Sequence, residues 1–450
     1  MLDPDVELLG RGLATYLIRH SAGRNLCIGN DCRLSSPRLH DALLKGFLAA
    51  GAQVLDIGTV PTPVLYYSAV HFKADGAVMI TGSHNPPEYN GFKTVSGSGT
   101  LHGPAIQEVH KLIQLRDFES GEGAVKRVDA VTPYIEEVTS QFKLSRKVKV
   151  VFDAGNGTAG PVLERMLKKL NIEATKLYFE MDGNFPNHHP DPTVLENLVP
   201  LQKAVEKQKA ELGIAFDGDT DRIGAVDENG SVVFGDMLLL IFGREILSRK
   251  PGATFIGEVK CSQVMYDKLA ELGGRPIMFK TGHSLIKAKM KEEHAELAGE
   301  MSGHMFFADR YFGYDDALYA ACRLIEIVAD SGQPLSHQLE GIPQMVSTPE
   351  LRVDCPDEIK FQVVEKVGEI VRRHHQVVDV DGVRVPFEKG WGLVRASNTQ
   401  PVLVMRFEAA SKDLLKKYRL EIESIVERAK EDVTATAPSE TNRVASLDGS

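Results

Sequence analysis

The chain has 450 residues, more than one compact hydrophobic core normally serves, so three or four domains are expected. Its formal net charge of -10 argues against general binding to nucleic acid or to anionic membranes, and its longest apolar run, residues 237–242, is far too short to span a bilayer. Five cysteines without framework spacing, and an acidic N-terminus without an apolar signal segment, predict a cytoplasmic protein with reduced thiols.

Short apolar runs alternate with amphipathic segments in the first part of the chain. Strands are predicted at residues 25–31, 52–58 and 76–82, and helices at 37–50 and 104–114. This alternation is typical of layered α/β structure, so the fold class is predicted as α/β with mixed sheets.

Three further regions follow along the chain. A second α/β unit opens with a strand, a glycine turn and a helix at 148–160, and a third begins near Asp236. The segments after it, with a helix around 363–374 and strands at 390–398 and 401–409, predict a smaller α+β domain. The polar end of the chain, 431–450, lacks an apolar period and predicts a disordered tail. The resulting domain division is 1–130, 131–235, 236–345 and 346–435, with the tail at 436–450.

The stretch TGSHNPPEYNGFK, residues 81–93, places reactive side chains on a stiff loop. Ser83 follows a predicted buried strand, Gly82 is expected to allow a sharp turn, and two prolines stiffen the chain beyond it. His84 and Lys93 offer a proton-transfer group and a cation. A serine so placed suits a nucleophile or a phosphate carrier. The alternative is a tight turn with incidental polar residues, which a lone serine–histidine pair would favour.

The stretch IAFDGDTDR, residues 214–222, predicts a metal site. An apolar strand ends in the alternating carboxylates Asp217, Asp219 and Asp221, and the glycine between the first two is expected to permit a tight loop. Carboxylates at this spacing converge on a hard divalent cation such as Mg2+, and without one they would repel each other. Arg222 adds a forked donor for phosphate. A solvated acidic turn is the alternative.

The same acidic loop supports a competing hypothesis. DGDTD after an apolar strand partly fits the DxDxT pattern of haloacid-dehalogenase-type phosphotransferases, with Asp217 as nucleophile and Mg2+ as cofactor. The fifth position of that pattern is Asp221 instead of threonine. This hypothesis leaves the serine loop without a role.

A glycine motif suggests a third chemistry. Gly155, Gly157 and Gly160 follow a strand in the spacing GxGxxG, and Glu180 lies about twenty residues on, as a dinucleotide-binding fingerprint requires. This motif is the basis of a dehydrogenase hypothesis. A structural strand–turn–helix is the alternative, because a single match to this pattern is weak evidence.

Two later loops carry groups suited to sugar and phosphate. In GEMSGH, residues 299–304, Glu300 and Ser302 can bind neighbouring sugar hydroxyls, and His304 can contact phosphate or move a proton. The segment KTGHS before it offers Lys280 and His283. The loop RASNTQP, residues 395–401, offers a forked cation and short hydroxyl and amide donors for phosphate: Arg395, Ser397, Asn398 and Thr399.

With TGSHNP, DGDTDR, GEMSGH and RASNT in this order, the chain resembles the α-D-phosphohexomutases, and most of all their bacterial phosphomannomutase/phosphoglucomutase branch. The resemblance covers nearly the whole chain, from Leu8 to about Glu431. GEMSGH, with methionine in its third position, is similar to the mannose/glucose branch and not to the glucosamine branch.

The resemblance implies four domains around one central cleft: three similar α/β units and a smaller C-terminal α+β domain, each contributing one loop. Ser83 would carry a phosphoryl group and transfer it between hexose 1-phosphate and hexose 6-phosphate through a 1,6-bisphosphate, which also serves as activator. Mg2+ would be held by Ser83, Asp217, Asp219 and Asp221. His84 and Lys93 would transfer protons, and Arg222 would neutralise charge. The implied substrate-binding set is Lys260, Lys280, His283, Glu300, Ser302, His304, Arg395, Ser397, Asn398 and Thr399.

The chain departs from the family pattern near its beginning. It starts at the helix after the YDIRG-like segment, so the first domain is expected to lack its usual first strand. Asn30 and Cys32 stand where arginine and glycine are usual, while Arg33 is kept. Tyr311 and Gln400 replace residues that are commoner in relatives. The missing segment motivates a further alternative, a non-catalytic protein that binds sugar phosphates. The expected partners are small hexose phosphates, with neither nucleic acid nor membrane, and the chain is expected to be a monomer or a homodimer.

Overall fold

The computed structural model describes residues 2–97, 99–397 and 400–436, which form two compact units. The large unit holds the residues up to Gly257 together with Lys268–Ile277 and Gly282–Glu340. The small unit holds Glu258–Asp267, Met278–Thr281 and the chain from Gly341 onward. Within the described residues, no helix has the length and the apolar composition needed to cross a lipid bilayer.

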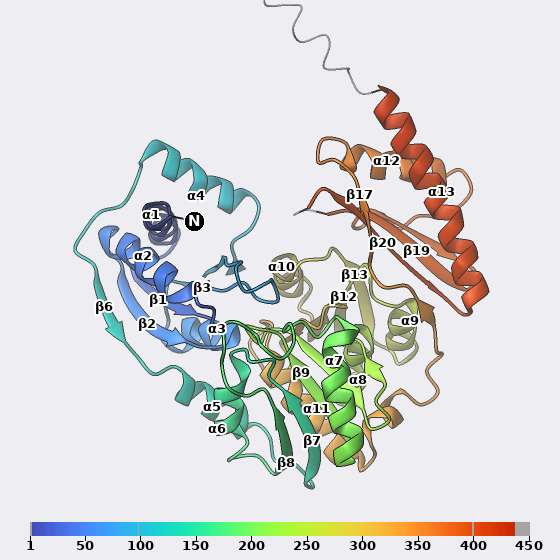
Figure 1. Ribbon diagram of the computed structural model, residues 1–450, viewed down its shortest axis with the longest axis horizontal. Helices are drawn as coiled ribbons and strands as arrows, with labels where there is room; N and C mark the ends of the chain where they lie inside the picture. The colour runs from blue at the N-terminus through green and yellow to red at the C-terminus, as the bar shows by residue number, and fades with distance from the viewer. Residues whose placement is uncertain (1, 98, 398–399, 437–450) are drawn as a thin grey trace, which may run out of the picture. The chain divides into compact units, whose positions relative to one another are not determined.

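The first sheet of the large unit has the strand order β5-β4-β3-β1-β2-β6 (Figure 1). Its parallel strands are β1 (Asn25–Asn30), β2 (Gln53–Thr59), β3 (Gly76–Ile80) and β6 (Ala124–Arg127), and β4 (Phe92–Ser96) and β5 (Gly99–Thr100) are antiparallel additions. The helices are α1 (Asp3–Arg19), α2 (Ser36–Ala49), α3 (Thr62–His71) and α4 (Pro104–Leu115). These bounds confirm the strands and helices predicted in this region.

The side chains of these strands alternate between the two faces of the sheet, as a pleated strand requires. Leu26 and Ile28 of β1, with Val78 and Ile80 of β3, belong to one core with apolar residues of α1, α2 and α4. Figure 1 shows these three helices on one side of the sheet and α3 on the other. The sheet is therefore covered on both faces, which leaves its strand ends as the place for chemistry.

The second sheet has the order β11-β10-β9-β7-β8. Its strands are β7 (Val148–Asp153), β8 (Ile172–Leu177), β9 (Leu212–Phe216), β10 (Ile223–Asp227) and β11 (Val232–Val233). Strand β7 pairs in parallel with β8 and β9, and β10 returns antiparallel to β9. The helices of this region are α5 (Val131–Ser140), α6 (Ala159–Met166) and α7 (Leu195–Gln208).

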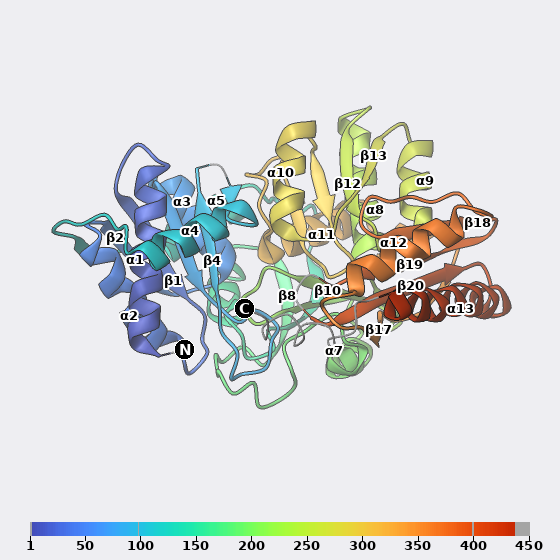
Figure 2. The same cartoon turned by 90° about the horizontal axis from the view of Figure 1, so that it is seen from above.

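The third sheet has the order β13-β12-β14-β15, and Figures 1 and 2 show β12 beside β13. Its strands are β12 (Thr254–Glu258), β13 (Arg275–Phe279), β14 (Leu297–Gly299) and β15 (Met305–Phe307). Strand β14 is parallel to β12, and β15 is antiparallel to β14. The accompanying helices are α8 (Gly235–Arg249), α9 (Gln263–Glu271), α10 (His283–Glu293), α11 (Ala317–Ser331) and the 3-10 helix η1 (Leu335–Leu339).

The three sheets share one topology. In each of them, the first strand lies between the second and the third, and a fourth strand returns antiparallel to the third. The connections from third to fourth strand are residues 81–91, 217–222 and 300–304. These connections contain the serine loop, the acidic loop and the GEMSGH loop, so the shared topology puts all three at equivalent sheet ends.

The small unit has an antiparallel sheet of β16 (Val346–Ser347), β17 (Leu351–Asp354), β18 (Val383–Phe387), β19 (Gly390–Ala396) and β20 (Val402–Ala409). Helices α12 (Lys360–Val371) and α13 (Lys412–Thr436) share one apolar core with it. The RASNT loop joins β19 to β20. The fold class predicted from the sequence, α/β units followed by an α+β domain, is therefore confirmed.

Two predicted boundaries in the small unit are wrong. The helix expected at 363–374 is α12, which ends at Val371, because the last residue of its buried period is Val371 and two exposed arginines follow. The tail expected from residue 431 is helical as far as Thr436, because Val433 extends the buried period of α13 by one more turn. The rest of that predicted tail lies outside the described residues.

Candidate active site

The three loops at the equivalent sheet ends meet in the large unit. The Ser83 hydroxyl donates a hydrogen bond of 2.8 Å to Oδ2 of Asp217, which joins the serine loop to the acidic loop. Arg222 pairs with His304 as an isolated antiparallel bridge, which joins the acidic loop to the GEMSGH loop. Groups expected to act together from the sequence are therefore within contact of one another.

Ser83 sits in an unusual backbone conformation. Its φ of 49° is left-handed, a region that non-glycine residues rarely adopt and that costs about 1–3 kcal/mol. The hydroxyl of Thr81 accepts the Ser83 backbone N–H at 2.8 Å and helps to hold this turn. Nδ1 of His84 lies 3.4 Å from the Ser83 hydroxyl oxygen. The half-buried serine is thus held at one orientation, facing Asp217.

Arg33 holds the serine loop from inside the protein. Its side chain is fully buried, and its guanidinium donates to the backbone carbonyls of Ser83 at 2.7 Å and Asn85 at 2.6 Å, and to those of Pro86 and Tyr89. Asp31 accepts Nε of Arg33 at 3.1 Å and the backbone N–H of Gly82 at 3.1 Å. A forked cation suits this task because it offers five donors in a fixed plane.

The glycines of these loops have a different role from the one predicted from the sequence. Neither Gly82 nor Gly218 has a positive φ; the left-handed residues are Ser83 and Thr220. A Cβ on Gly82 would lie 2.5 Å from Cζ of Arg33, and one on Gly218 would lie 2.6 Å from the carbonyl oxygen of Ser83. Both glycines are needed so that neighbouring groups can approach the backbone, and not for a sharp turn.

The acidic loop forms the candidate metal centre. Asp217, Asp219 and Asp221 are fully buried, and one carboxylate oxygen from each lies within 4.8 Å of those of the others. Oδ1 of Asp219 and Oδ1 of Asp221 have no hydrogen-bond partner among the described residues. Buried carboxylate oxygens left unpaired are costly, so this donor set fits a hard divalent cation.

The remaining oxygens of this group are tied to protein donors. Oδ1 of Asp217 accepts the backbone N–H groups of Asp221 at 3.0 Å and Arg222 at 3.1 Å. Lys93 donates to Oδ2 of Asp219 at 2.7 Å and also binds Asp221. The Thr62 hydroxyl donates to Oδ2 of Asp219 at 2.6 Å. The loop is therefore organised by its own backbone and by side chains from the first sheet.

Burial and neighbouring charges shift the pKa values of the ionisable groups in the site. Burial, together with the neighbouring Asp219 and Asp221, raises the pKa of Asp217 well above its ordinary value. Burial also acts to raise the pKa of Asp219, but the Lys93 ammonium outweighs it and lowers that pKa. The pKa of Lys93 is raised by the same pairing, despite burial. Burial, assisted by Arg222, lowers the pKa of His84 to about 3, so this imidazole is neutral at pH 7.

His304 lies beside Asp315, which in turn binds Lys287, and sequence reasoning missed both of these residues. Nε of Arg222 donates to Nε2 of His304 at 3.0 Å, so in neutral His304 the proton is on Nδ1, which lies 3.1 Å from Oδ2 of Asp315. Lys287 donates to Oδ1 of Asp315 at 2.9 Å. The signal that could have found Asp315 is the paired aspartates of GYDDA, directly before a helix. Lys287 shows no such signal, because it lies within a lysine-rich helix.

The GEMSGH loop is also joined to the KTGHS segment. Oε1 of Glu300 accepts the backbone N–H of Gly282 at 2.7 Å, one residue before His283. Burial, assisted by Lys287, lowers the pKa of His283 well below its ordinary value. Ser302 is half-buried on the same loop. The large unit thus brings the predicted sugar-binding groups next to the serine and acidic loops.

In the small unit, the structure groups the other predicted ligands. Nε of Arg395 donates to Oδ2 of Asp381 at 3.0 Å, and the same oxygen accepts the backbone N–H of Thr281, next to Lys280, at 3.1 Å. The Thr281 hydroxyl donates to Glu258 at 2.7 Å, and Nζ of Lys260 lies 3.7 Å from Glu258. Arg395 and Lys260 therefore belong to one polar network, and Lys280 is next to it in the sequence.

Ser397 belongs to the same loop as Arg395, where its backbone N–H donates to the carbonyl of Val402 at 3.0 Å. Its hydroxyl accepts the backbone N–H of Gln400 at 3.2 Å. Ser397 therefore helps to close the turn between β19 and β20. Asn398 and Thr399, also expected to bind phosphate, lie outside the described residues.

The GxGxxG motif has a packing role in this structure. A Cβ on Gly157 would lie 2.7 Å from the carbonyl oxygen of Gly218, and one on Gly160 would lie 1.9 Å from that of Phe179. Gly157 allows the acidic loop to approach the backbone of this turn, and Gly160 allows α6 to approach the chain after β8. This arrangement accounts for both glycines without a dinucleotide.

Sequence models of one family match nearly the whole chain. They are described as phosphoglucomutase/phosphomannomutase alpha/beta/alpha domain I, matching residues 2–120, domain II, matching 132–230, domain III, matching 234–346, and the C-terminal domain, matching 350–425. The chain belongs to the phosphoglucomutase/phosphomannomutase family.

Individual relatives in this family agree. The phosphomannomutase/phosphoglucomutase of Pseudomonas aeruginosa is 45% identical over 395 residues, covering 88% of this chain and 85% of the relative. The phosphoglucomutase of Neisseria gonorrhoeae is 41% identical, covering 95% of this chain and 94% of the relative. The crystal structure of a family protein from Burkholderia thailandensis superposes with a TM-score of 0.89 at 41% identity, covering 97% of this chain and 95% of that one.

These comparisons confirm the resemblance read from the four loops. The chain is a phosphohexomutase, an enzyme that transfers a phosphoryl group within hexose phosphates. They support neither the haloacid-dehalogenase-type phosphatase nor the dehydrogenase. Asp217, the nucleophile of the phosphatase hypothesis, has both carboxylate oxygens engaged by Ser83 and by backbone N–H groups.

Proposed function

We propose that this enzyme interconverts the 1-phosphates and 6-phosphates of mannose and glucose through a phosphoserine at Ser83. One observation carries the proposal: the Ser83 hydroxyl, in a left-handed turn braced by Arg33, lies 2.8 Å from Asp217 in a group of three buried carboxylates. The names of the relatives support both sugars, since that from Pseudomonas aeruginosa carries both activities and that from Neisseria gonorrhoeae is named for glucose.

Mg2+ is the proposed cofactor, held by Asp217, Asp219, Asp221 and a Ser83 oxygen. The two unpaired buried oxygens of Asp219 and Asp221 support this assignment. Bound there, the ion would neutralise charge on the phosphoryl oxygens during transfer. The protein's own contribution is to fix the carboxylates in place before the substrate arrives, which the backbone N–H bonds to Asp217 achieve.

The electrostatics assign different roles to the two predicted proton-transfer residues. His84 is neutral at pH 7 and its Nδ1 lies 3.4 Å from the Ser83 hydroxyl oxygen, so it can accept a proton. Lys93 stays protonated because its pKa is raised, so it donates a proton or neutralises charge. Arg222 adds a second fixed cation at the same place. Each transfer needs a proton moved in the opposite direction, and this pair supplies an acceptor and a donor.

Recognition of the sugar and of the second phosphate is assigned to the remaining loops. We assign the sugar hydroxyls to Glu300 and Ser302. The phosphate that is not being transferred is assigned to Arg395, Ser397, Asn398 and Thr399. The rest of the proposed substrate-binding set is Lys260, Lys280, His283 and His304. The network that joins Arg395 to the segments of Lys260 and Lys280 supports this grouping. In this proposal the chain has four domains, divided near residues 130, 235 and 345, and the 1,6-bisphosphate turns around between the two transfers.

The free state of all five cysteines is compatible with a reducing compartment, so we place the enzyme in the cytoplasm.

Phosphorus NMR tests the proposal directly. The full chain is incubated with Mg2+, a trace of glucose 1,6-bisphosphate and either mannose 1-phosphate or glucose 1-phosphate. Conversion to the 6-phosphates supports the mutase, free phosphate alone would support a phosphatase, and binding without turnover would support a non-catalytic protein. Ser83→Ala should lose at least about 10⁴-fold in turnover, whereas the exposed Ser140→Ala should be unchanged. Mass spectrometry should find the phosphoryl group on the peptide that contains Ser83.

A further inference from the structure

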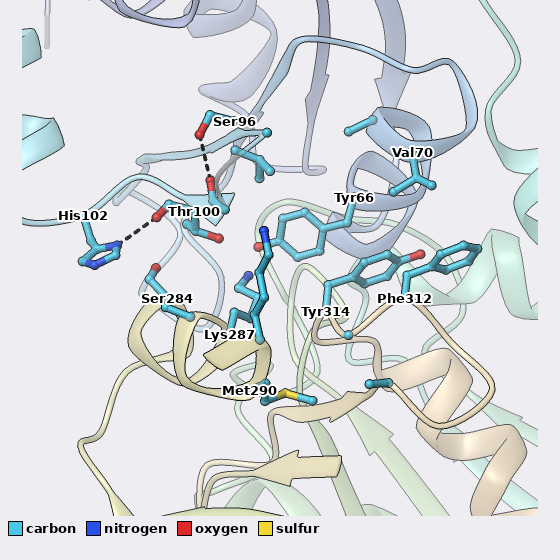
Figure 3. A pocket seen from close by; sticks show the side chains of 18 of the residues that line it. Tyr66, Val70, Ser96, Thr100, His102, Ser284, Lys287, Met290, Phe312 and Tyr314 are labelled. Carbon is cyan, nitrogen blue, oxygen red and sulfur yellow. Dashed lines mark hydrogen bonds between the residues drawn. The ribbon is translucent and has the colours of Figure 1, made fainter. Parts of the chain in front are cut away.

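The large unit contains a pocket apart from the loops described above. Its volume is about 670 Å³, within the range of small-molecule sites, and Figure 3 shows it from close by. Its walls come from four segments that are distant in the sequence: the C-terminal half of α3, the hairpin of β4 and β5, helix α10, and residues 308–314.

The pocket lies at the opposite strand ends from the catalytic loops. Gly76, which lines it, is the first residue of β3, whereas Ser83 follows the last residue of that strand. Glu296 and Ala308, which also line it, flank the outer ends of β14 and β15, whereas the GEMSGH loop joins their other ends. A ligand here would therefore occupy a different site from the hexose phosphate.

One side of the pocket is apolar and rich in aromatic rings. Figure 3 shows the rings of Tyr66, Tyr314 and Phe312 on one side of the view, with Val70 above and Met290 below them. Val70 is 48% exposed and Phe312 is 44% exposed, so large apolar side chains reach solvent at this place. Tyr66 and Tyr314 are buried, so the exposed ring that a flat aromatic ligand can stack on is that of Phe312.

The other side of the pocket is cationic. Ser284, Lys287 and Lys291 follow one another at helical spacing, so they share the face of α10 that lines the pocket. Nζ of Lys287 lies 4.3 Å from the centroid of the Tyr66 ring, and Lys291 has no ion pair among the described residues. The acidic side chain that lines the pocket, Glu296, is paired with Lys250 at 2.9 Å.

We propose that this pocket binds an aromatic organic anion. Its ring would stack on Phe312 and pack against Val70, and its anionic group would lie between Lys287 and Lys291. An apolar wall with a few convergent cationic donors suits this class of ligand, because the wall gains from burial and the ammonium groups fix the orientation. A sugar phosphate, which lacks an aromatic face, would leave the ring side of this pocket unused.

Such a ligand would act on the catalytic site through Lys287. The same ammonium that lines the pocket donates to Asp315 at 2.9 Å, and Asp315 lies 3.1 Å from the imidazole of His304. An anion in the pocket competes with Asp315 for this ammonium. Because His304 is oriented by Asp315 on one side and Arg222 on the other, loss of this hold lowers turnover, so the ligand acts as an inhibitor.

The probe for this site is 8-anilinonaphthalene-1-sulfonate, an aromatic anion whose fluorescence rises on burial. Titration of the folded full chain should give saturable binding at one site, and the same concentrations should lower mutase turnover. Lys291→Glu reverses an exposed charge on the pocket wall and should weaken binding at least about tenfold. Val70→Trp should fill the mouth and also weaken binding. Neither residue belongs to the catalytic site, so turnover without the probe should stay as in the parent chain.

Lys111→Glu is the matched control, because it makes the same charge change on exposed α4, away from the pocket, and should bind the probe like the parent chain. Equal affinity in Lys291→Glu and in Val70→Trp, or no saturable binding, would overturn the proposal. Displacement of the probe by hexose phosphates would overturn its separateness from the catalytic site. Turnover measured without the probe tests the proposed function, and probe binding tests the pocket, so failure of one proposal is distinguished from failure of the other.

Discussion

The serine loop and the acidic loop occupy equivalent places in two sheets of the same topology, yet they are built in opposite ways. Each begins after a third strand and ends at an antiparallel fourth strand, with Ile80 paired to Phe92 in one and Phe216 paired to Ile223 in the other. The acidic loop has six residues, 217–222, and nearly all are buried. The serine loop is longer, and much of it is half-buried or exposed.

The two loops are also held in place differently. Asp217 binds the backbone of its own loop, to which Lys93 and Thr62 add bonds from outside, whereas the serine loop is held by a buried side chain from outside it, Arg33. A short buried loop can hold like charges close together only because backbone N–H groups and the Lys93 ammonium compensate them, and it offers little access. A longer loop reaches the substrate but needs an external brace to keep one conformation. A loop that holds several buried carboxylates must be short and enclosed. A loop that exposes a reactive hydroxyl must be longer and needs support from elsewhere in the chain.

The largest expected effect comes from replacing one of the three clustered carboxylates of the acidic loop. Asp217→Asn keeps an acceptor for the backbone N–H groups but removes a carboxyl whose charged form is disfavoured by burial and by two acidic neighbours. Turnover should fall at least about 10³-fold, whereas the free energy of unfolding without metal should rise by about 1–2 kcal/mol at pH 7. Activity assays and urea denaturation in EDTA measure both. A loss of stability in EDTA would contradict the idea that this loop stores unfavourable charge.

Asp227→Asn is the control for that experiment. Asp227 is a buried aspartate on the same strand pair, at the far end of β10, and it caps a turn through the backbone N–H groups of Asn229 and Ser231. Its substitution should leave turnover nearly unchanged and lower stability slightly.

Removing the brace of the serine loop should have the next largest effect. Arg33→Lys keeps the charge but not the fork that reaches several carbonyls, so the loop should lose its fixed conformation. Turnover should fall about 10²-fold, and the free energy of unfolding by about 3 kcal/mol. Steady-state kinetics and thermal denaturation test this, with the exposed Arg127→Lys as the matched control. Full activity in Arg33→Lys would show that the loop needs no external brace.

A smaller effect is expected at the third equivalent loop. Asp315→Ala removes the carboxylate beside Nδ1 of His304, and turnover should fall about tenfold, as is typical when the partner of a functional imidazole is lost. Asp315→Asn keeps an acceptor and should retain more activity than the alanine variant. Nitrogen NMR of His304 should report the proton on Nδ1 in both chains, because Arg222 donates to Nε2, but with a shifted Nδ1 resonance in Asp315→Ala. An unchanged spectrum would remove Asp315 from the orientation of His304.

The smallest expected effect concerns stability and pH. The unfolded chain protonates His84 below about pH 6.5, but the folded chain does so only near pH 3, because burial lowers its pKa to about 3. The unfolded state therefore binds more protons between these values, and the free energy of unfolding falls as the pH falls. The contribution is about 2 kcal/mol between pH 6.5 and pH 5. Urea titrations should show this slope reduced in His84→Gln; an equal slope in both chains would assign it to other groups.

Much of this molecule could be predicted from its sequence, for identifiable reasons. Ser83, the three aspartates and Glu300 lie on loops directly after apolar strands, so the local pattern locates both the strand and its functional end. Arg33 in its bracing role and Lys287 could not be found in this way, because their partners lie far along the chain. The roles of Gly82 and Gly218 were mistaken because a glycine looks the same in a sequence whether it supplies a positive φ or room for a neighbour.

Because each of the three loops starts and ends at a hydrogen-bonded strand pair, its length and content can change without moving the sheet beneath it. The pairs Ile80 with Phe92, Phe216 with Ile223 and Gly299 with Met305 fix the register at each loop base. Insertions between them extend outward into solvent or toward the ligand. The residues of each loop can therefore change during evolution independently of the other two loops, while the strand pairing beneath them stays the same.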